Sequence, residues 1–381
     1  HRHRLTAVAT RRLSPVPKSG AAAPAGRSIR VMLVDDSLIV RSVLERIIGT
    51  APGMTVCASV ASAAAALDWL AQDRADLIIL DIEMPGMTGL AALPQILAQG
   101  GSARVLILSS NCAEGGPAAV EALALGASDT LAKPGRGSFA GTFTDVLLNR
   151  VRSLVAAPAL VHAPAQPRAA ERGRTAPLAM TGPIECIAVA ASTGGIPAFA
   201  SFLGNLDPAI TAPILLTQHL PDAFIAYYAQ QIASASKRPV HVARAGMRLA
   251  ANHVYLAPGD AHLGLARVGR HVEIVLDRTP VANGCCPSAD PMFAAVADVY
   301  GAGGVGVVLS GMGRDGADGA ALLRSAGGTV LAQAPESCVV WGMPGAVANA
   351  GVANAVLNPD AIAVLLSNGG AQTGLGAGPG A

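Results

Sequence analysis

Apolar segments of strand length alternate with helix-length segments twice along the chain, and this alternation constrains the fold more than any other feature. Short runs such as 31–34 and 77–80 are wholly apolar, without the polar alternation of a half-exposed strand. Strands of this kind, alternating with helices, are typical of parallel sheets that helices cover on both faces. The sequence therefore predicts an α/β fold of doubly wound, mainly parallel sheets.

The alternation falls into two series with a different kind of sequence between them. The first fills residues 29–155 and the second residues 184–369, with an antiparallel pair expected around residues 253–276. Residues 156–183 are rich in Ala and Pro and lack a hydrophobic period, which is typical of a linker. A length of 381 residues also favours two domains over one.

Both ends of the chain are expected to lie outside these domains. Residues 1–28 are basic, contain no acidic residue and lack the apolar region of a secretion signal, so we interpret them as a disordered tail. Residues 370–381 form a glycine-rich tail. The longest uncharged run, 337–359, is broken by Pro344 and three asparagines, which makes it a poor membrane span. We therefore expect a cytoplasmic protein without direct membrane insertion.

Charge and cysteine usage argue against several functions. The net charge is +2 and no basic stripe is present, so nothing indicates binding to nucleic acid. Six cysteines and eight histidines are scattered, without a disulfide framework or the spacing of a zinc site. Cys285 and Cys286 are adjacent, and we interpret them as two ordinary thiols rather than a redox pair.

Polar residues end four predicted strands of the first series: Asp35 with Asp36, Asp81, Ser109 and Lys133. The carboxyl ends of parallel strands gather at one edge of a sheet. Three acids in one place repel one another unless a hard cation such as Mg²⁺ lies among them. A lysine could balance the charge of a phosphoryl group, and a hydroxyl could donate to its oxygens. The pattern indicates a metal-dependent phosphoryl site.

These motifs, VDD, LDIEMPGMTGL, LSS and AKP in this order, resemble the receiver domain of bacterial response regulators. The resemblance covers most of residues 29–155. It implies that Asp81 accepts a phosphoryl group from a histidine kinase, with Mg²⁺ held by Asp35, Asp36 and Asp81. It also implies that Ser109 and Lys133 read the phosphorylated state. One position departs from the family, because Thr130 stands where an aromatic residue is usual.

Three further polar residues follow predicted strands of the second series. Ser192 ends AVAAS, His219 ends LLTQH, and Asp315 lies in the glycine-rich loop of VVLSGMGRD. A serine hydroxyl is a weak nucleophile until a base removes its proton, and an acid must orient that base. These residues could supply that set, and a following helix N-terminus could bind an oxyanion. Alternatively, Ser192 or Thr193 only caps the helix and His219 is a core residue.

A dinucleotide site is a competing interpretation of the same region. Residues Gly311–Gly316 match G-x-G-x-x-G after a strand, and Glu336 lies twenty residues further on. Two features count against it. Asp315 would repel the pyrophosphate, and Glu336 falls beyond Pro335, past the strand end where a ribose-binding acid belongs.

The motifs AASTGG, TQHLP, YLAPGDAHL, PSADPMF, LSGMGRDGADG and VVWGMPGAV resemble, in their order, the chemotaxis protein-glutamate methylesterase family, CheB. The resemblance covers nearly all of residues 184–366, and an upstream receiver and linker match the family's arrangement. It implies that Ser192 is the nucleophile, His219 the base and Asp315 the residue that orients it. The implied oxyanion site consists of Thr193, Gly194, Met312 and Gly313. Cys286 departs from the family, which often has an arginine there.

The resemblance implies a phosphorylation-activated enzyme that hydrolyses glutamate γ-methyl esters on methyl-accepting chemotaxis receptors and deamidates glutamines. Its phosphodonor would be the histidine kinase CheA, Mg²⁺ would serve receiver phosphorylation, and hydrolysis would need no cofactor. In the family the unphosphorylated receiver covers the catalytic cleft. An alternative is a response regulator whose output domain only binds receptors or partners. A nucleotide-binding output domain is a third interpretation, and it predicts NAD binding near Gly311.

Overall fold

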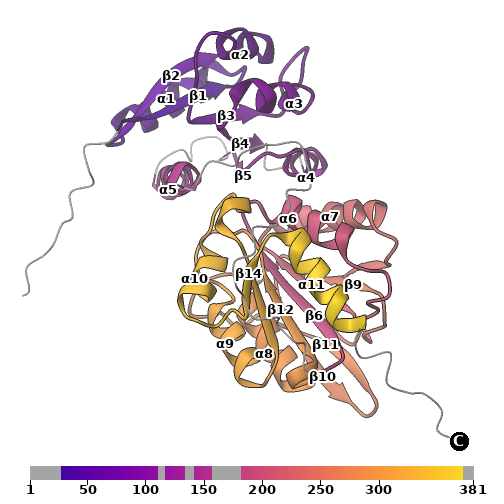
Figure 1. The fold of residues 1–381 in the computed structure, drawn as a ribbon. Coiled ribbons are helices and arrows are strands. Elements are labelled where there is room, and N and C mark those ends of the chain that lie inside the picture. Colours follow the sequence, from indigo (N-terminus) through magenta and orange to yellow (C-terminus); the bar gives the residue numbers. More distant parts are fainter. Residues whose placement is uncertain (1–26, 110–115, 134–140, 157–181, 372–381) are drawn as a thin grey trace, which may run out of the picture.

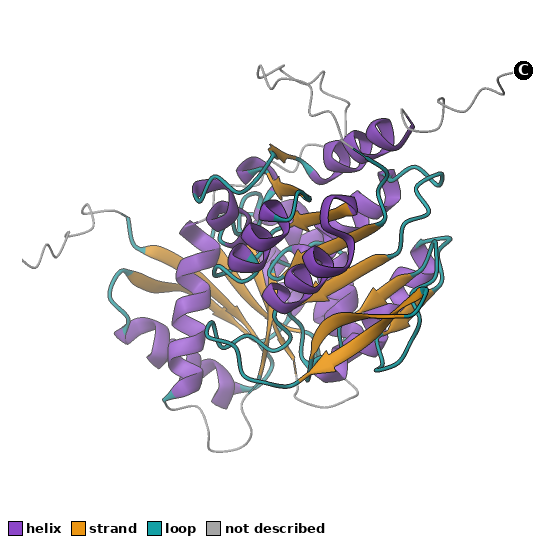
Figure 2. Ribbon diagram, turned by 90° about the horizontal axis from the view of Figure 1, so that it is seen from below, coloured by secondary structure: helices purple, strands orange, loops and turns teal. Residues whose placement is uncertain are grey.

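The computed structural model describes residues 27–109, 116–133, 141–156 and 182–371 (Figure 1). The predicted basic tail, linker and glycine-rich tail lie largely outside the described residues. The chain forms two parallel sheets with helices on both faces of each (Figure 2), as the predicted fold class requires. We call residues 27–156 the N-terminal half and residues 182–371 the C-terminal half. No helix in the described part of the chain is long and apolar enough to span a membrane.

The N-terminal half has five strands in the order β2-β1-β3-β4-β5, all paired in parallel. This is the flavodoxin-like order, whose switch point lies between β1 and β3. The strands are β1 (Ile29–Val34), β2 (Met54–Val60), β3 (Leu77–Asp81), β4 (Arg104–Ser109) and β5 (Asp129–Ala132). The helices are α1 (Leu38–Thr50), α2 (Ala63–Leu70), α3 (Gly89–Gly100), α4 (Gly116–Ala124) and α5 (Thr142–Ala156).

Local sequence explains how the helices of this half begin and pack. Ser37 caps α1, because its hydroxyl accepts a hydrogen bond from the Val40 amide at 3.4 Å. Thr88 caps α3 in the same way. At the start of α3, a Cβ on Gly89 would lie 1.9 Å from the backbone oxygen of Asp81. Only glycine therefore allows α3 to pack so close to the end of β3.

The C-terminal half has seven strands in the order β14-β13-β12-β6-β7-β9-β8, and every neighbouring pair is parallel. The chain builds outward from β6 in both directions, so the switch point lies between β6 and β12. The strands are β6 (Cys186–Ala191), β7 (Ile214–Gln218), β8 (Val240–Val242), β9 (Val254–Leu256), β12 (Gly304–Val308), β13 (Thr329–Gln333) and β14 (Ala355–Leu357). The helices are α6 (Gly195–Asn205), α7 (Asp222–Ala235), α8 (Ala289–Tyr300), α9 (Ala317–Ser325), α10 (Met343–Asn349) and α11 (Pro359–Ala371).

A separate antiparallel hairpin, β10 (His262–Val268) with β11 (His271–Asp277), packs beside this sheet. The predicted antiparallel pair was placed partly wrongly, since β9 belongs to the parallel sheet and the pair begins only at His262. The edge strands β8 and β14 were not predicted. Each has three residues and only one neighbour, so neither carries the long apolar run that marks a buried strand.

The two halves contact each other through α4, β5 and α5, which face the C-terminal half (Figure 1). At the start of α4, a Cβ on Gly116 would lie 3.0 Å from the Tyr227 ring of α7. Val339 and Val340 of the C-terminal half pack in one apolar cluster with residues of the N-terminal half. This contact brings the N-terminal half to the carboxyl end of β6, where the candidate site lies.

Candidate active site

The switch point of the C-terminal sheet brings three strand ends together. Ser192 follows β6, His219 follows the adjacent β7, and Asp315 lies in the loop between β12 and α9. Ligands of open α/β sheets bind in the crevice outside the carboxyl ends at such a point. The three residues singled out from the sequence therefore lie around one crevice.

Asp315 holds His219 in a defined orientation. The Nε2 atom of His219 lies 2.8 Å from Asp315 Oδ2. The carboxylate also accepts hydrogen bonds from the Ser288 hydroxyl at 2.5 Å, the Ala289 amide at 2.7 Å and the Asn283 amide group at 2.6 Å. With Nε2 engaged, Nδ1 is the nitrogen of His219 that remains for another partner. Among the described residues, no hydrogen bond joins His219 to the Ser192 hydroxyl.

The hydrogen bonds to Asp315 lower its pKa more than burial raises it. The residue is 2% exposed, and burial alone raises the pKa of a carboxyl. The bonds from His219, Ser288 and Ala289 act in the opposite direction and hold the pKa of Asp315 at about 2. The carboxylate is therefore ionised at neutral pH and can stabilise a positive charge on His219.

Acidification is expected to remove the stability that Asp315 contributes. The pKa of Asp315 in the folded protein is about 2, below the usual 3.8. Its contribution to the free energy of unfolding is therefore fully present above pH 3.8 and is lost as the pH falls towards 2. The difference corresponds to about 2 kcal/mol. Urea unfolding of wild type and Asp315→Asn, followed through Trp341 with Trp69 replaced by Phe, should show a difference near pH 5 that shrinks towards pH 2. A pH-independent difference would contradict this, and Asp318→Asn, an exposed neighbour, serves as the control.

In the turn after Ser192, glycines allow neighbouring segments of the chain to pack closely together. Gly194 has φ +75°, and a Cβ there would lie 2.4 Å from the Val339 Cβ. Gly311 packs directly against the serine, since a Cβ on Gly311 would lie 2.9 Å from the Ser192 Cβ. The Gln218 side chain donates to the Ser192 carbonyl at 2.9 Å. These contacts fix where the Ser192 side chain begins.

The capping alternative for this turn is wrong. The residue at the N-cap of α6 is Gly194, and no side chain accepts a capping hydrogen bond there. Neither Ser192 nor Thr193 thus caps the helix. The first backbone N–H groups of a helix lack partners within the helix, and those of α6 could stabilise a negative charge that develops beside the turn.

The residues expected around an oxyanion lie on two neighbouring loops. Thr193 and Gly194 follow β6, and Met312 and Gly313 follow β12, its neighbour in the sheet. The segment that starts α10 supports the second loop, because the amides of Gly342 and Met343 both donate to the Gly311 carbonyl. Thr193 is 6% exposed, and its hydroxyl is engaged by the N-terminal half.

That engagement is a hydrogen bond between the halves. The Thr193 hydroxyl donates to Asp129 Oδ2 at 2.8 Å, and the same carboxylate is paired with Arg150 of α5. Residues of both halves line an adjoining cavity of about 250 Å³, among them Thr130 and His219. The N-terminal half therefore contacts the candidate site at Thr193 and shares a cavity wall with His219.

A second site lies at the switch point of the N-terminal sheet. Lys133 Nζ is 3.0 Å from Asp35 Oδ2 and 2.6 Å from Asp81 Oδ2. Burial raises the pKa of Asp81, and it outweighs the opposite effect of Lys133. For Lys133, burial lowers the pKa, but the hydrogen bonds to Asp81 and Asp35 raise it overall. The lysine is thus charged, and Asp81 is held beside a cation.

These acids fit a hard divalent cation. Carboxylate oxygens of Asp35, Asp36 and Asp81 lie within 4.8 Å of one another, and oxygen is the ligand that Mg²⁺ prefers. Asp36 is exposed while the other two are buried, which leaves the site open on one side. The Ser109 hydroxyl is buried and has no hydrogen-bond partner among the described residues. An oxygen of an incoming group could supply that partner.

His219, Asp315 and Cys285 also offer ligand atoms within 4.8 Å of one another. They suit a metal less well. Burial raises the pKa of Cys285 to about 11, so the thiol is protonated at neutral pH, and the Asp315 oxygens already accept hydrogen bonds. Cys285 and Cys286 are both free thiols in the structure.

The structure also argues against the dinucleotide interpretation. A Cβ on Gly311 would lie 2.4 Å from the Met343 sulfur, so side chains already occupy the space that a pyrophosphate would need. Asp315 turns inward to His219, and Glu336 lies in a short 3₁₀ turn (Pro335–Ser337) beyond β13.

Sequence reasoning missed several residues of the site. Ser288 and Asn283 bind Asp315, Gln218 binds the Ser192 carbonyl, and Asp129 reaches Thr193 from the other half. Ser288 lies in the PSAD motif, which was a usable signal. Asn283 and Asp129 belong to no motif, and only the fold brings them to the site.

The fold and the two sites define a class of protein: a response regulator whose receiver is joined to an α/β output domain with Ser, His and Asp at its switch point. The family model of the response regulator receiver domain matches residues 31–138, and that of the CheB methylesterase matches residues 187–366. A protein-glutamate methylesterase/protein-glutamine glutaminase 2 from Caulobacter vibrioides is 43% identical over 337 residues, covering 88% of this chain and 96% of that protein. The chain belongs to the CheB methylesterase family.

A second curated relative and one solved structure are also similar to the chain. A protein-glutamate methylesterase/protein-glutamine glutaminase from Rhodopseudomonas palustris is 37% identical over 355 residues, covering 86% of this chain and 91% of that protein. The Thermotoga maritima CheB methylesterase catalytic domain, known from a crystal structure, has 35% sequence identity to this chain and a TM-score of 0.47. The match covers 48% of this chain and 97% of that domain's chain.

Proposed function

We propose that the protein hydrolyses γ-methyl esters of glutamate residues on methyl-accepting chemotaxis receptors, and that phosphorylation of Asp81 activates it. The observation that carries this proposal is the Asp315–His219 hydrogen bond, at the strand end adjacent to Ser192. Family membership supplies the class of substrate, because the curated relatives are named protein-glutamate methylesterases.

In the first step the Ser192 hydroxyl attacks the ester carbonyl carbon while His219 takes its proton. Because Nε2 is engaged with Asp315, the proton goes to Nδ1. The tetrahedral intermediate then breaks its bond to the methoxy oxygen, and His219 returns the proton so that methanol leaves. An acyl group remains on Ser192, and the ionised Asp315 stabilises the imidazolium while it exists.

In the second step water hydrolyses the acyl-enzyme. His219 takes a proton from water, hydroxide attacks the acyl carbon, and Ser192 leaves with the proton from His219. The product is a free glutamate carboxylate on the receptor. The same steps convert a glutamine amide to glutamate, with ammonia leaving in place of methanol. Backbone N–H groups of Thr193, Gly194, Met312 and Gly313 would stabilise the oxyanion in both reactions.

Control of the reaction resides in the contact between the halves. The Thr193–Asp129 hydrogen bond and the cavity shared with His219 support a closed form of low activity. The histidine kinase CheA is the proposed phosphodonor, and Asp81 accepts the phosphoryl group. Mg²⁺ bound by Asp35, Asp36 and Asp81 would neutralise the charge that accumulates there. Lys133 and Ser109 then bind phosphoryl oxygens, which shifts the population towards an open form.

Methanol release from methylated receptor membranes tests this proposal. Acetyl phosphate with Mg²⁺ should raise the rate of the wild type on the order of 10-fold, which is a typical coupling between two sites. Asp81→Asn should stay at the basal rate, because an amide cannot accept the phosphoryl group. Asp68→Asn, at an exposed position of α2, should respond as the wild type does.

The outcomes separate the two parts of the proposal. Equal stimulation of wild type and Asp81→Asn would reject control through Asp81 and leave the esterase in place. No methanol from the wild type on any of several receptors would instead favour an output domain that only binds receptors or partners.

A further inference from the structure

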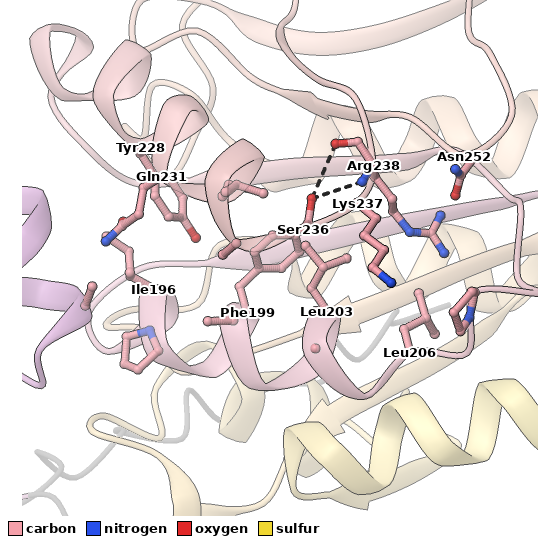
Figure 3. A pocket seen from close by; sticks show the side chains of 17 residues that line it. Ile196, Phe199, Leu203, Leu206, Tyr228, Gln231, Ser236, Lys237, Arg238 and Asn252 are labelled. Carbon is pink, nitrogen blue, oxygen red and sulfur yellow. Dashed lines mark hydrogen bonds between the residues drawn. The ribbon is translucent and has the colours of Figure 1, made fainter.

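A cavity of about 540 Å³ lies between α6 and α7 of the C-terminal half, apart from both sites described above (Figure 3). Ser192, His219 and Asp315 do not line it. Its size falls within the range of small-molecule sites in proteins. The question is which molecule its walls fit.

Most of the wall is apolar. Phe199 and Leu203 of α6 form the middle of it, with Ile196 and Leu206 of the same segment on either side (Figure 3). Ile232 of α7 also lines the cavity. Phe199 and Ile232 are buried in the protein yet border this empty space. An apolar chain would fill the middle of the cavity and remove this surface from water.

Three polar atoms in the wall lack partners. The Tyr228 hydroxyl, Gln231 Oε1 and Arg238 Nη1 are buried and make no hydrogen bond to any described residue. They are three of the six such atoms in the described part of the chain. Buried polar groups in native proteins are normally satisfied. Their concentration in one cavity points to a ligand that supplies the missing partners.

The polar atoms lie at opposite ends of the cavity. Tyr228 and Gln231 are at one end, and Arg238 and Asn252 are at the other (Figure 3). Arg238 is 8% exposed and is held in place, because Nη2 donates to the Ile210 carbonyl and the backbone amide bonds the Ser236 hydroxyl. The Nη1 group, which has no partner among the described residues, is therefore held in a fixed position in the wall at this end of the cavity.

The Arg238 end carries positive charge without an acid to balance it. Lys237 lines the cavity at the same end, and no acidic residue is among the lining residues. Within the described ranges neither Lys237 nor Arg238 forms an ion pair. A guanidinium forms short, charge-assisted hydrogen bonds with carboxylate and phosphate groups. A carboxylate is the smaller of these anions and is the head group that we assign to the ligand.

We propose that this cavity binds a single-chain amphipathic carboxylic acid. Its carboxylate pairs with Arg238, and Lys237 adds to the attraction. Its apolar chain lies against Phe199 and Leu203. A hydroxyl group at the far end of the chain would bind both Tyr228 and Gln231, by accepting from the tyrosine and donating to the amide oxygen.

Calorimetric titration of the full chain tests the proposal directly, without any assay of hydrolysis. The probes are decanoate, decanol, decyl sulfate and the ω-hydroxy derivative of decanoate. Wild type should bind decanoate about 10-fold to 100-fold more tightly than decanol, the usual effect of a hydrogen bond to a charged group. The ω-hydroxy acid should bind more tightly still.

Variants assign each end of the ligand. Arg238→Met should remove the preference for decanoate over decanol while decanol still binds, which shows that the cavity persists. Arg244→Met, at an exposed position, is the matched control and should bind as the wild type does. Tyr228→Phe should remove only the preference for the ω-hydroxy acid. Leu203→Trp fills the cavity without altering Arg238 and should weaken all four probes.

Several results would overturn the proposal. They are the absence of binding by any probe, equal binding of decanoate and decanol to the wild type, and binding of decyl sulfate in preference to decanoate. Unchanged binding to Leu203→Trp would place the ligand elsewhere on the protein. The first of these results would mean that water alone satisfies the three polar atoms.

Discussion

Replacement of Ser192 by Ala is expected to lower methanol release by about 10⁴-fold or more, the usual effect of removing a nucleophile from such a set. The variant keeps His219, Asp315 and the backbone N–H groups, but it cannot form the acyl-enzyme. The rate should be measured after phosphorylation, so that the contact between the halves does not mask the loss. Ester hydrolysis that remains would reflect water activated by His219.

The matched control for this variant is Ser234→Ala. Ser234 is exposed on α7, and its hydroxyl only donates to the Gln230 carbonyl within the same helix. It should release methanol as the wild type does. If Ser192→Ala kept a rate within tenfold of the wild type, Ser192 would not be the nucleophile and direct attack by water would replace the two-step reaction.

Asp315→Asn is expected to lower kcat by about 10⁴-fold, while KM changes little. An asparagine can keep the packing, but its neutral amide cannot stabilise a positive His219. In the wild type, His219, the Ser288 hydroxyl and the Ala289 amide all bond the carboxylate oxygens. The asparagine side chain offers these groups only one oxygen, and its N–H₂ group cannot accept a hydrogen bond. The imidazole is then held in the wrong tautomer for proton transfer.

The design of this experiment must separate catalysis from folding. Asp318→Asn, three residues away and exposed in the first turn of α9, controls for the loss of one negative charge nearby. Circular dichroism of both variants at the assay temperature shows whether the fold is kept. A folded Asp315→Asn protein with the kcat of Asp318→Asn would mean that Asp315 does not orient His219.

The central strands account for how much of the site the sequence could predict. β6, β7 and β12 are fully buried, and β6 and β12 carry no polar side chain, so a polar residue that follows them stands out. Ser192 was located by this signal. His219 was located by the apolar start of β7, although Thr217 and Gln218 precede it, and Asp315 by the glycine-rich loop that follows β12. The same signal located Asp35, Asp81, Ser109 and Lys133 in the N-terminal half. Parallel pairing then requires that these ends meet.

Other features depend on contacts that no local pattern records. Asn283 reaches Asp315 from a loop thirty-two residues earlier in the chain, and Asp129 reaches Thr193 from the other half. The sequence also left open whether Ser192 or Thr193 caps the helix that follows, because Ser and Thr are good capping residues in general. The positive φ at Gly194 and the crowding by Val339 decide it, and both are properties of the folded chain.

The carboxylate of Asp129 lowers the cost of breaking the hydrogen bond between the halves. It is paired with Arg150 of its own half as well as with Thr193, so separation of the halves leaves it with a partner. At this polar contact only the Thr193 hydroxyl must exchange its acceptor for water, a net change of about 1.5–3 kcal/mol for a hydrogen bond to a charged group. That amount matches the free energy that one binding event commonly transmits between sites. Separation of the halves would also expose the apolar packing of Val339 and Val340. If phosphorylation separates the halves as proposed, this hydrogen bond can break and form again in repeated cycles.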